Sequence, residues 1–134
     1  KLELVAHLKN TLGVTIIDIG AAPGERVDYP DYAHTLCAAI LAGEADAGIL
    51  VCGTGIGMSM AANRHAGIRA ALCANEYMAR MAREHNDANV LCMGSRVLGP
   101  ELQKSIADAF VSTAFAGGRH ELRVKKIELS NEEE

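Results

Sequence analysis

The chain has 134 residues, of which 49% are hydrophobic, so it can bury a core of its own, and we exclude general disorder. We expect one domain over residues 1–129 and a polar tail at 130–134. The net charge of −4 and the small aromatic set of three Tyr, two Phe and no Trp argue against a nucleic-acid or anionic-membrane partner. No apolar run approaches the roughly 20 residues of a membrane helix, and the chain does not open with a signal-peptide pattern, so we expect a soluble, cytoplasmic protein.

Short apolar runs alternate with helical patterns along the chain. Helical spacing predicts helices at 1–12, from Pro30 to Gly43, at 56–64, at 76–83, from Pro100 onward and at 120–129. The apolar runs, rich in β-branched residues, predict strands at 14–19, 47–52, 68–73 and 89–93. Such alternation is typical of an α/β fold in which a parallel sheet lies between two layers of helices, connected by right-handed crossovers.

Two of the predicted helices carry apolar stripes that we expect to be buried. Leu102, Ile106 and Phe110 share one face of the helix that starts at Pro100. Leu122 and Ile127 would be the apolar contacts of the last helix.

Four cysteines lie in apolar stretches without a CxxC or another zinc-ligand spacing. We interpret Cys37, Cys73 and Cys92 as free thiols of a reducing compartment and expect no metal site. Cys52 differs because it stands at the end of a predicted strand, immediately before a glycine-rich loop.

That loop, Cys52-Gly-Thr-Gly-Ile-Gly-Met-Ser, joins a strand to a helix. Its G-x-G-x-G spacing matches neither the dinucleotide fingerprint nor the P-loop. Free backbone N–H groups in such a loop favour an anion or an oxyanion, and a thiol at that place can act as a base or a nucleophile. The alternatives are a plain tight turn and, for Cys52, a buried core cysteine.

Three further polar positions stand out. His85 lies in the polar run 83–89, which could equally be a solvated turn, and Arg96 follows a strand end. Arg119 and Arg123 are one helical turn apart after two glycines. They could hold one dianion such as a phosphate, or form a surface ion-pair ladder with Glu121.

Several ordered motifs of the chain resemble the B-type ribose-5-phosphate isomerases, to which the galactose-6-phosphate isomerase subunits are related. The matching stretches are 28–33 (DYPDYA), 52–59 (CGTGIGMS), 61–63 (AAN), 67–71 (GIRAA), 85–91 (HNDANVL) and 117–120 (GGRH). The resemblance extends to about Ile127. It implies a three-layer Rossmann-like fold and a metal-free aldose–ketose isomerase without cofactor. It also implies a homodimer, or a tetramer of paired dimers, whose active sites draw residues from both subunits.

The resemblance also implies roles in catalysis. The position of Cys52 would hold the base that moves a proton between C2 and C1. The loop of Gly53, Gly55, Ile56 and Gly57 would hold the enediolate oxygens. Another branch of the family uses a carboxylate four residues later, and this chain has Ile56 there, which leaves Cys52 as the loop's candidate base.

Further roles carried over by the resemblance concern ring opening and phosphate binding. Thr54 and His85 would assist opening of the sugar ring, with His85 as the proton donor, and Asn86 would bind sugar hydroxyls. Arg119 and Arg123 would hold the phosphate, with Arg96 reaching across the dimer.

Two points stay open at the level of the sequence: the start of the chain and the function itself. Members of the family begin with a strand that ends in an Asp-His pair facing the substrate, and we expect that an N-terminal strand is missing from this sequence. The expected reaction interconverts ribose 5-phosphate and ribulose 5-phosphate. The alternatives are a hexose 6-phosphate substrate, such as allose or galactose 6-phosphate, and a phospho-sugar binding module without turnover.

Overall fold

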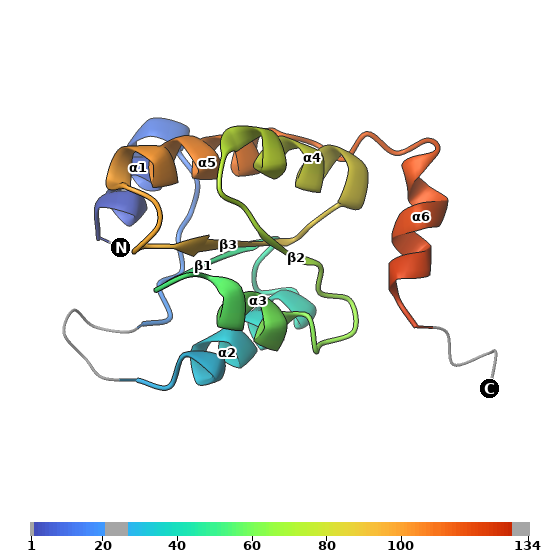
Figure 1. The fold of residues 1–134 in the computed structure, drawn as a ribbon, viewed down its shortest axis with the longest axis horizontal. Coiled ribbons are helices and arrows are strands. Elements are labelled where there is room, and N and C mark those ends of the chain that lie inside the picture. Colours follow the sequence, from blue (N-terminus) through green and yellow to red (C-terminus); the bar gives the residue numbers. More distant parts are fainter. Residues whose placement is uncertain (1, 21–26, 130–134) are drawn as a thin grey trace.

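The computed structural model describes residues 2–20 and 27–129 (Figure 1). The elements follow one another as α1 (Leu2–Leu12), α2 (Tyr29–Leu41), β1 (Gly48–Cys52), α3 (Ile56–Ala62), β2 (Ala70–Leu72), α4 (Glu76–Asn86), β3 (Val90–Gly94), α5 (Pro100–Ser112) and α6 (His120–Ile127). The predicted polar tail at 130–134 lies outside the described residues.

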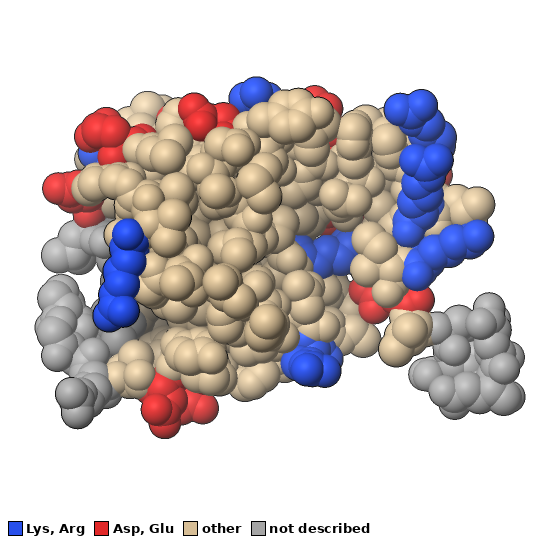
Figure 2. All heavy atoms as spheres, viewed as in Figure 1, with Lys and Arg blue, Asp and Glu red and all other residues tan. Residues whose placement is uncertain are grey.

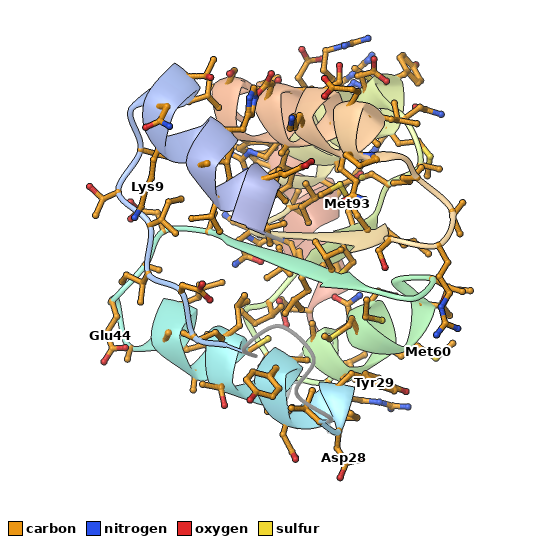
Figure 3. All side chains as sticks on the ribbon, turned by 90° about the vertical axis from the view of Figure 1, so that its left-hand side faces the viewer. Lys9, Asp28, Tyr29, Glu44, Met60 and Met93 are labelled. Carbon is orange, nitrogen blue, oxygen red and sulfur yellow. The ribbon has the colours of Figure 1, made fainter. Side chains whose placement is uncertain are left out.

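The described strands form one parallel sheet in the order β1-β3-β2, with Gly48 beside Val90 and Cys52 beside Gly94. Helices α1, α4 and α5 cover one face of this sheet, and α2 and α3 cover the other (Figure 1). Figure 3 shows the same layers after a quarter turn, with Met93 on the α5 side of the strands. The predicted three-layer Rossmann-like architecture is therefore confirmed.

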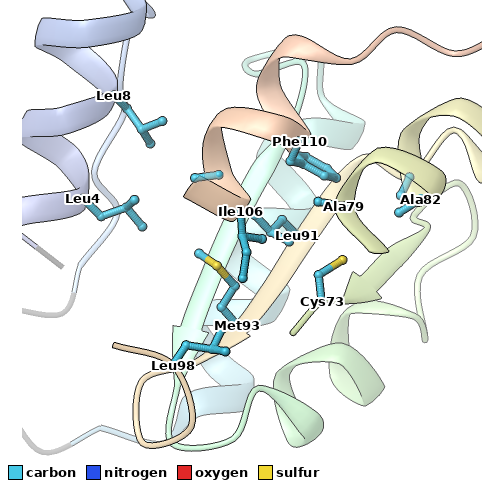
Figure 4. Packing of buried hydrophobic residues seen from close by; sticks show 12 residues of the cluster. Leu4, Leu8, Cys73, Ala79, Ala82, Leu91, Met93, Leu98, Ile106 and Phe110 are labelled. Carbon is cyan, nitrogen blue, oxygen red and sulfur yellow. The ribbon is translucent and has the colours of Figure 1, made fainter. Parts of the chain in front are cut away.

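Strand β3 is the centre of the core, since all five of its residues are buried. Its side chains alternate between the two faces of the sheet, as the pleat requires. Leu91 and Met93 pack with Ile106 and Phe110 beneath α5 (Figure 4). Val90 and Cys92 belong to the second core cluster, under α2 and α3. Burial on both faces explains why this strand reads as a continuous apolar run.

The chain reverses its winding direction between β1 and β3. The loop after β1 leads to α3 on one face, and the loop after the neighbouring strand β3 leads to α5 on the other. Parallel sheets bind ligands at such a point, outside the carboxyl ends of the strands. Cys52 and Arg96 both lie there.

The predicted strand at 14–19 is wrong: no described strand pairs with this segment. Val14 and Ile16 pack against the core cluster beneath α5, while Ile17 is exposed. β-branched residues favour a strand only where a neighbouring strand supplies the hydrogen bonds.

The predicted burial of two apolar stripes is wrong in part. On α5, Ile106 and Phe110 are buried, but Leu102 is exposed. On α6, Leu122 and Ile127 are exposed, at 60% and 51%, and the helix carries no buried residue. This happens because α6 stands beyond the amino ends of the strands, beside the end of α4, where no core lies beneath it (Figure 1).

The remaining predicted elements are confirmed with shifted ends. The predicted strand at 68–73 shrinks to the three residues of β2, and α4 runs three residues beyond Arg83. Helix α4 starts where the Asn75 side chain accepts a hydrogen bond from the Met78 N–H, at 2.9 Å. It ends at Asp87, whose φ of +46° is in the left-handed region. Arg83 donates to the Asp87 carboxylate at 3.0 Å and so holds this strained turn.

Candidate active site

Cys52 ends β1 at the winding reversal, and its thiol is half-buried. The other three cysteines are buried free thiols, as predicted. Burial raises the pKa of Cys73 to about 11 and that of Cys92 to about 12, and it also raises the pKa of Cys37. These three buried thiols therefore stay protonated at neutral pH, which leaves Cys52 as the one cysteine of the described residues whose thiol is not buried.

Backbone hydrogen bonds fasten the loop after β1 to the loop after β3. The N–H of Ser95 donates to the Cys52 carbonyl at 2.8 Å, and the N–H of Arg96 donates to the Gly53 carbonyl at 3.0 Å. The Arg96 side chain lies over Gly53, since a Cβ at Gly53 would meet Arg96 Cδ at 3.7 Å. Arg96 therefore belongs to the same end of the molecule as Cys52.

Glycines are needed in this loop for conformation and space. Gly55 has a φ of +83°, and a Cβ there would come within 2.9 Å of the Met93 backbone. A Cβ on Gly94 would lie 2.6 Å from the Thr54 carbonyl oxygen. The two loops thus touch through glycine backbone, which fixes the position of Cys52 relative to the loop.

Several N–H groups of the loop have no partner within the described chain. The N–H of Ile56 donates to Thr54 Oγ1 at 3.2 Å. The N–H groups of Gly53, Gly55 and Gly57 take part in no hydrogen bond that the described residues form. Unused donors beside a thiol can stabilise an oxyanion that forms next to that thiol.

Tyr29 is a neighbour of this loop to which the sequence pattern assigned no role. Its ring lies against Gly57, and a side chain at Gly57 would collide with the phenol. The only available signal was its place in the motif at 28–33. Figure 3 shows Tyr29 and Met60 on the α2–α3 side of the sheet.

The structure places the other predicted residues at the opposite end of the sheet. His85 and Asn86 form the last turn of α4, which leads back to the amino end of β3. Arg119 and Arg123 belong to the start of α6, beside that turn. We refer to His85, Asn86, Arg119, His120 and Arg123 as the amino-end cluster.

His120 joins this cluster without having been predicted. Its ring stacks on that of His85, with centroids 4.3 Å apart and the planes 17° from parallel. Partial burial, together with the charges of His85, Arg119 and Arg123, lowers the pKa of His120 below its ordinary value. The neutral form is therefore favoured, and the cluster concentrates positive charge on the two arginines. Figure 2 shows Lys and Arg side chains gathered over α6.

Within one copy of the chain, the Cys52 loop and the amino-end cluster lie at opposite ends of the sheet. Cys52 is level with Gly94 at the carboxyl end of the sheet, whereas His85 precedes Val90 at the amino end. The four residue steps of β3 between these levels amount to about 13 Å. Figure 1 shows the separation: the strands point away from α6.

The described residues include no group of three or more His, Cys, Asp or Glu side chains that could hold a metal ion. None of the helices in the described ranges is long and apolar enough to cross a membrane.

Comparison with known proteins assigns the chain to a family. A family model described as Ribose/Galactose Isomerase matches residues 1–127. Ribose-5-phosphate isomerase B of Escherichia coli K12 is 53% identical over 127 residues, which are 95% of this chain and 85% of that protein. D-erythrulose-4-phosphate isomerase of Pectobacterium atrosepticum is 47% identical over 128 residues, covering 90% of this chain and 84% of that protein.

Solved structures agree. A ribose 5-phosphate isomerase from Thermotoga maritima superposes with a TM-score of 0.87 at 54% identity, covering 95% of this chain and 90% of the other. The type B enzyme of Trypanosoma cruzi superposes with a TM-score of 0.90 at 41% identity, covering 94% and 85%. The chain therefore belongs to the ribose/galactose isomerase family.

Proposed function

We propose that this isomerase interconverts ribose 5-phosphate and ribulose 5-phosphate, and that two copies of the chain share each active site. The observation that carries the proposal is the position of Cys52 at the winding reversal, beside N–H groups of Gly53, Gly55 and Gly57 that bond to none of the described residues. The 53% identity to a ribose-5-phosphate isomerase B supports the choice of substrate.

The proposed reaction moves one proton between two carbons. The Cys52 thiolate takes the proton from C2 of the open-chain aldose; the released electron pair forms the C1–C2 double bond, and the π pair of the C1–O1 double bond moves onto O1, which gives the enediolate. In the return step the C1–C2 π pair takes the proton back from the thiol at C1, O2 loses its proton and forms the C2 carbonyl, and O1 takes up that proton to become a hydroxyl. Because negative charge develops on the oxygens between these steps, N–H donors fixed in the loop stabilise the transition state more than the substrate.

The amino-end cluster would supply the remaining roles from the partner subunit. His85 would donate a proton to the ring oxygen as the sugar opens, with help from the Thr54 hydroxyl of the first subunit, and Asn86 would bind sugar hydroxyls. Arg119 and Arg123 would hold the phosphate, with Arg96 at the boundary between the subunits.

Two observations support a dimer. The first is the separation of Cys52 from His85 within one chain, which leaves each end of the molecule with half of the expected site. The second is the exposure of large apolar side chains on the helices beside the sheet: Met60 is 63% exposed and Tyr77 is 64% exposed. Figure 2 shows few charged side chains in the middle of the face over α3 and α4. Uncharged, apolar faces of this kind are typical of protein contacts. A cytoplasmic location remains a prediction, consistent with the four free cysteines.

The test is a solvent-deuterium experiment followed by NMR. The purified protein is incubated in D2O with ribose 5-phosphate, allose 6-phosphate, galactose 6-phosphate and D-erythrulose 4-phosphate, the last because of the Pectobacterium relative. We expect deuterium at C1 and C2 and the highest kcat/KM for ribose 5-phosphate. A higher kcat/KM for a hexose or tetrose phosphate would correct the substrate. Binding of all four sugars without deuterium uptake would contradict the isomerase and favour a binding module.

A further inference from the structure

Helix α6 contains Arg123 and is preceded directly by Arg119, the two arginines of the amino-end cluster, but the core does not hold it in place. It is eight residues long, about 12 Å, and it has no buried residue. At its start, His120 stacks on His85. A second attachment at the other end would be needed to fix the direction of the helix, and hence the position of Arg119 and Arg123.

Glu128, the residue that follows α6, makes that second attachment. Its Oε1 accepts a hydrogen bond from the Gly67 N–H at 3.0 Å and lies 3.9 Å from an Arg69 guanidinium nitrogen. The Arg69 side chain is only 19% exposed, so this charge pair is partly shielded from water. Gly67 and Arg69 belong to the turn between α3 and β2, which is distant from α6 in sequence.

Arg69 connects this attachment to the end of α4. Its Nε donates to the Asp87 carbonyl at 2.8 Å, and Asp87 directly follows His85 and Asn86. Asn89 reinforces the same turn, because its side chain accepts from the Arg69 N–H at 2.8 Å and donates to the Gly67 carbonyl at 2.9 Å. The turn that Glu128 contacts is therefore held to the end of α4 and the start of β3 by several hydrogen bonds.

We propose that Glu128 is a positioning residue: by binding Gly67 and Arg69, it holds α6 so that Arg119 and Arg123 face the phosphate of the sugar on which His85 acts. This inference rests on the proposed function, since it takes the two arginines as the phosphate site. Glu128 itself touches no substrate; it acts through the direction of the helix.

The test compares three variants of the full chain. Glu128→Ala removes both contacts, whereas Glu128→Gln keeps an oxygen acceptor for the Gly67 N–H and loses the charge that faces Arg69. Glu121→Gln is the matched control: it removes one negative charge from the first turn of α6, and the Glu121 side chain forms no hydrogen bond or ion pair with the described residues. Hydrogen exchange of the amides of 120–127, KM, kcat and melting temperature are measured for each.

We expect Glu128→Ala to speed exchange in α6 and to raise KM for ribose 5-phosphate about three- to tenfold, which is equivalent to about 0.6–1.4 kcal/mol of lost binding, with kcat changed less. The exchange rates and the KM of Glu128→Gln should lie between those of Glu128→Ala and the wild type. Those of Glu121→Gln should match the wild type. Unchanged exchange and unchanged KM in Glu128→Ala would overturn the proposal.

A combined variant decides whether Glu128 acts through the two arginines. In a background that carries both Arg119→Ala and Arg123→Ala, Glu128→Ala should raise KM little further, because both contacts that it positions are already gone. A full, multiplicative rise would overturn the proposal. If Arg119→Ala alone leaves KM unchanged, the phosphate site of the proposed function is wrong and the link from Glu128 to phosphate falls with it, while the exchange data still report whether Glu128 holds the helix.

Discussion

The imidazole rings of His85 and His120 stack 4.3 Å apart, and Arg119 and Arg123 raise the positive charge around them. Burial and these neighbouring charges lower the pKa of His120. A bound dianion would offset the arginines, favour the protonated ring and so raise this pKa.

This relationship can be measured by an NMR titration of the His120 ring, with and without sulfate, which stays a dianion across the titration. Without sulfate the midpoint should lie below the ordinary histidine value of about 6.5, and sulfate should move it upward. Arg123→Ala should raise the midpoint without sulfate and reduce the sulfate effect. A titration midpoint that is the same with and without sulfate would mean that no anion binds beside His120.

Thiol chemistry should distinguish Cys52 from the other cysteines. Because burial raises the pKa of Cys73 to about 11 and of Cys92 to about 12, their thiolate fractions at pH 8 are negligible. Iodoacetamide at pH 8 should therefore label Cys52 in the folded protein, as read by peptide mass spectrometry, and Cys52→Ala should take up almost no label. Rapid labelling of Cys92 in the native state would contradict the burial described above.

Glycine contacts between the two loops should be sensitive to a single methyl group. A Cβ on Gly94 would lie 2.6 Å from the Thr54 carbonyl oxygen, so Gly94→Ala should lower the free energy of unfolding by about 1–3 kcal/mol and reduce kcat by displacing the Cys52 loop. Gly99→Ala is the control, because no described atom lies within 4 Å of a Cβ there. Urea unfolding of both variants checks the difference; equal stabilities would show that the loops can separate without cost.

The sequence was sufficient to predict the layers of this fold because burial leaves a pattern. Val90 to Gly94 read as one apolar run because both faces of β3 are covered. The run at 14–19 has the same composition but no described neighbouring strand, and composition cannot show whether a strand has a partner.

The site was less predictable than the fold. The loop after Cys52 could be recognised because glycine spacing is local, and the one-turn spacing of Arg119 and Arg123 is local as well. Which end of the sheet each group occupies depends on the path of α4 and α6, and no local pattern encodes that path. For the same reason the stack of His120 on His85 was not predicted, although His120 directly follows Arg119 in the sequence.

The proposed active site combines Cys52 of one subunit with the amino-end cluster of the other. This combination can be tested with a hybrid dimer purified through two different tags, one on each subunit. One subunit carries Cys52→Ala, and its partner carries Arg119→Ala together with Arg123→Ala. Each variant alone should be almost inactive at low substrate concentration, with a loss of at least about a hundredfold in kcat/KM for Cys52→Ala.

If the site is shared, one site of the hybrid contains both Cys52→Ala and the two altered arginines. The other site contains an unaltered Cys52 from one subunit and an unaltered amino-end cluster from its partner. We therefore predict that the hybrid recovers about half of the wild-type kcat/KM for ribose 5-phosphate, as two-fold symmetry requires. A hybrid as inactive as its two parents would contradict the shared site.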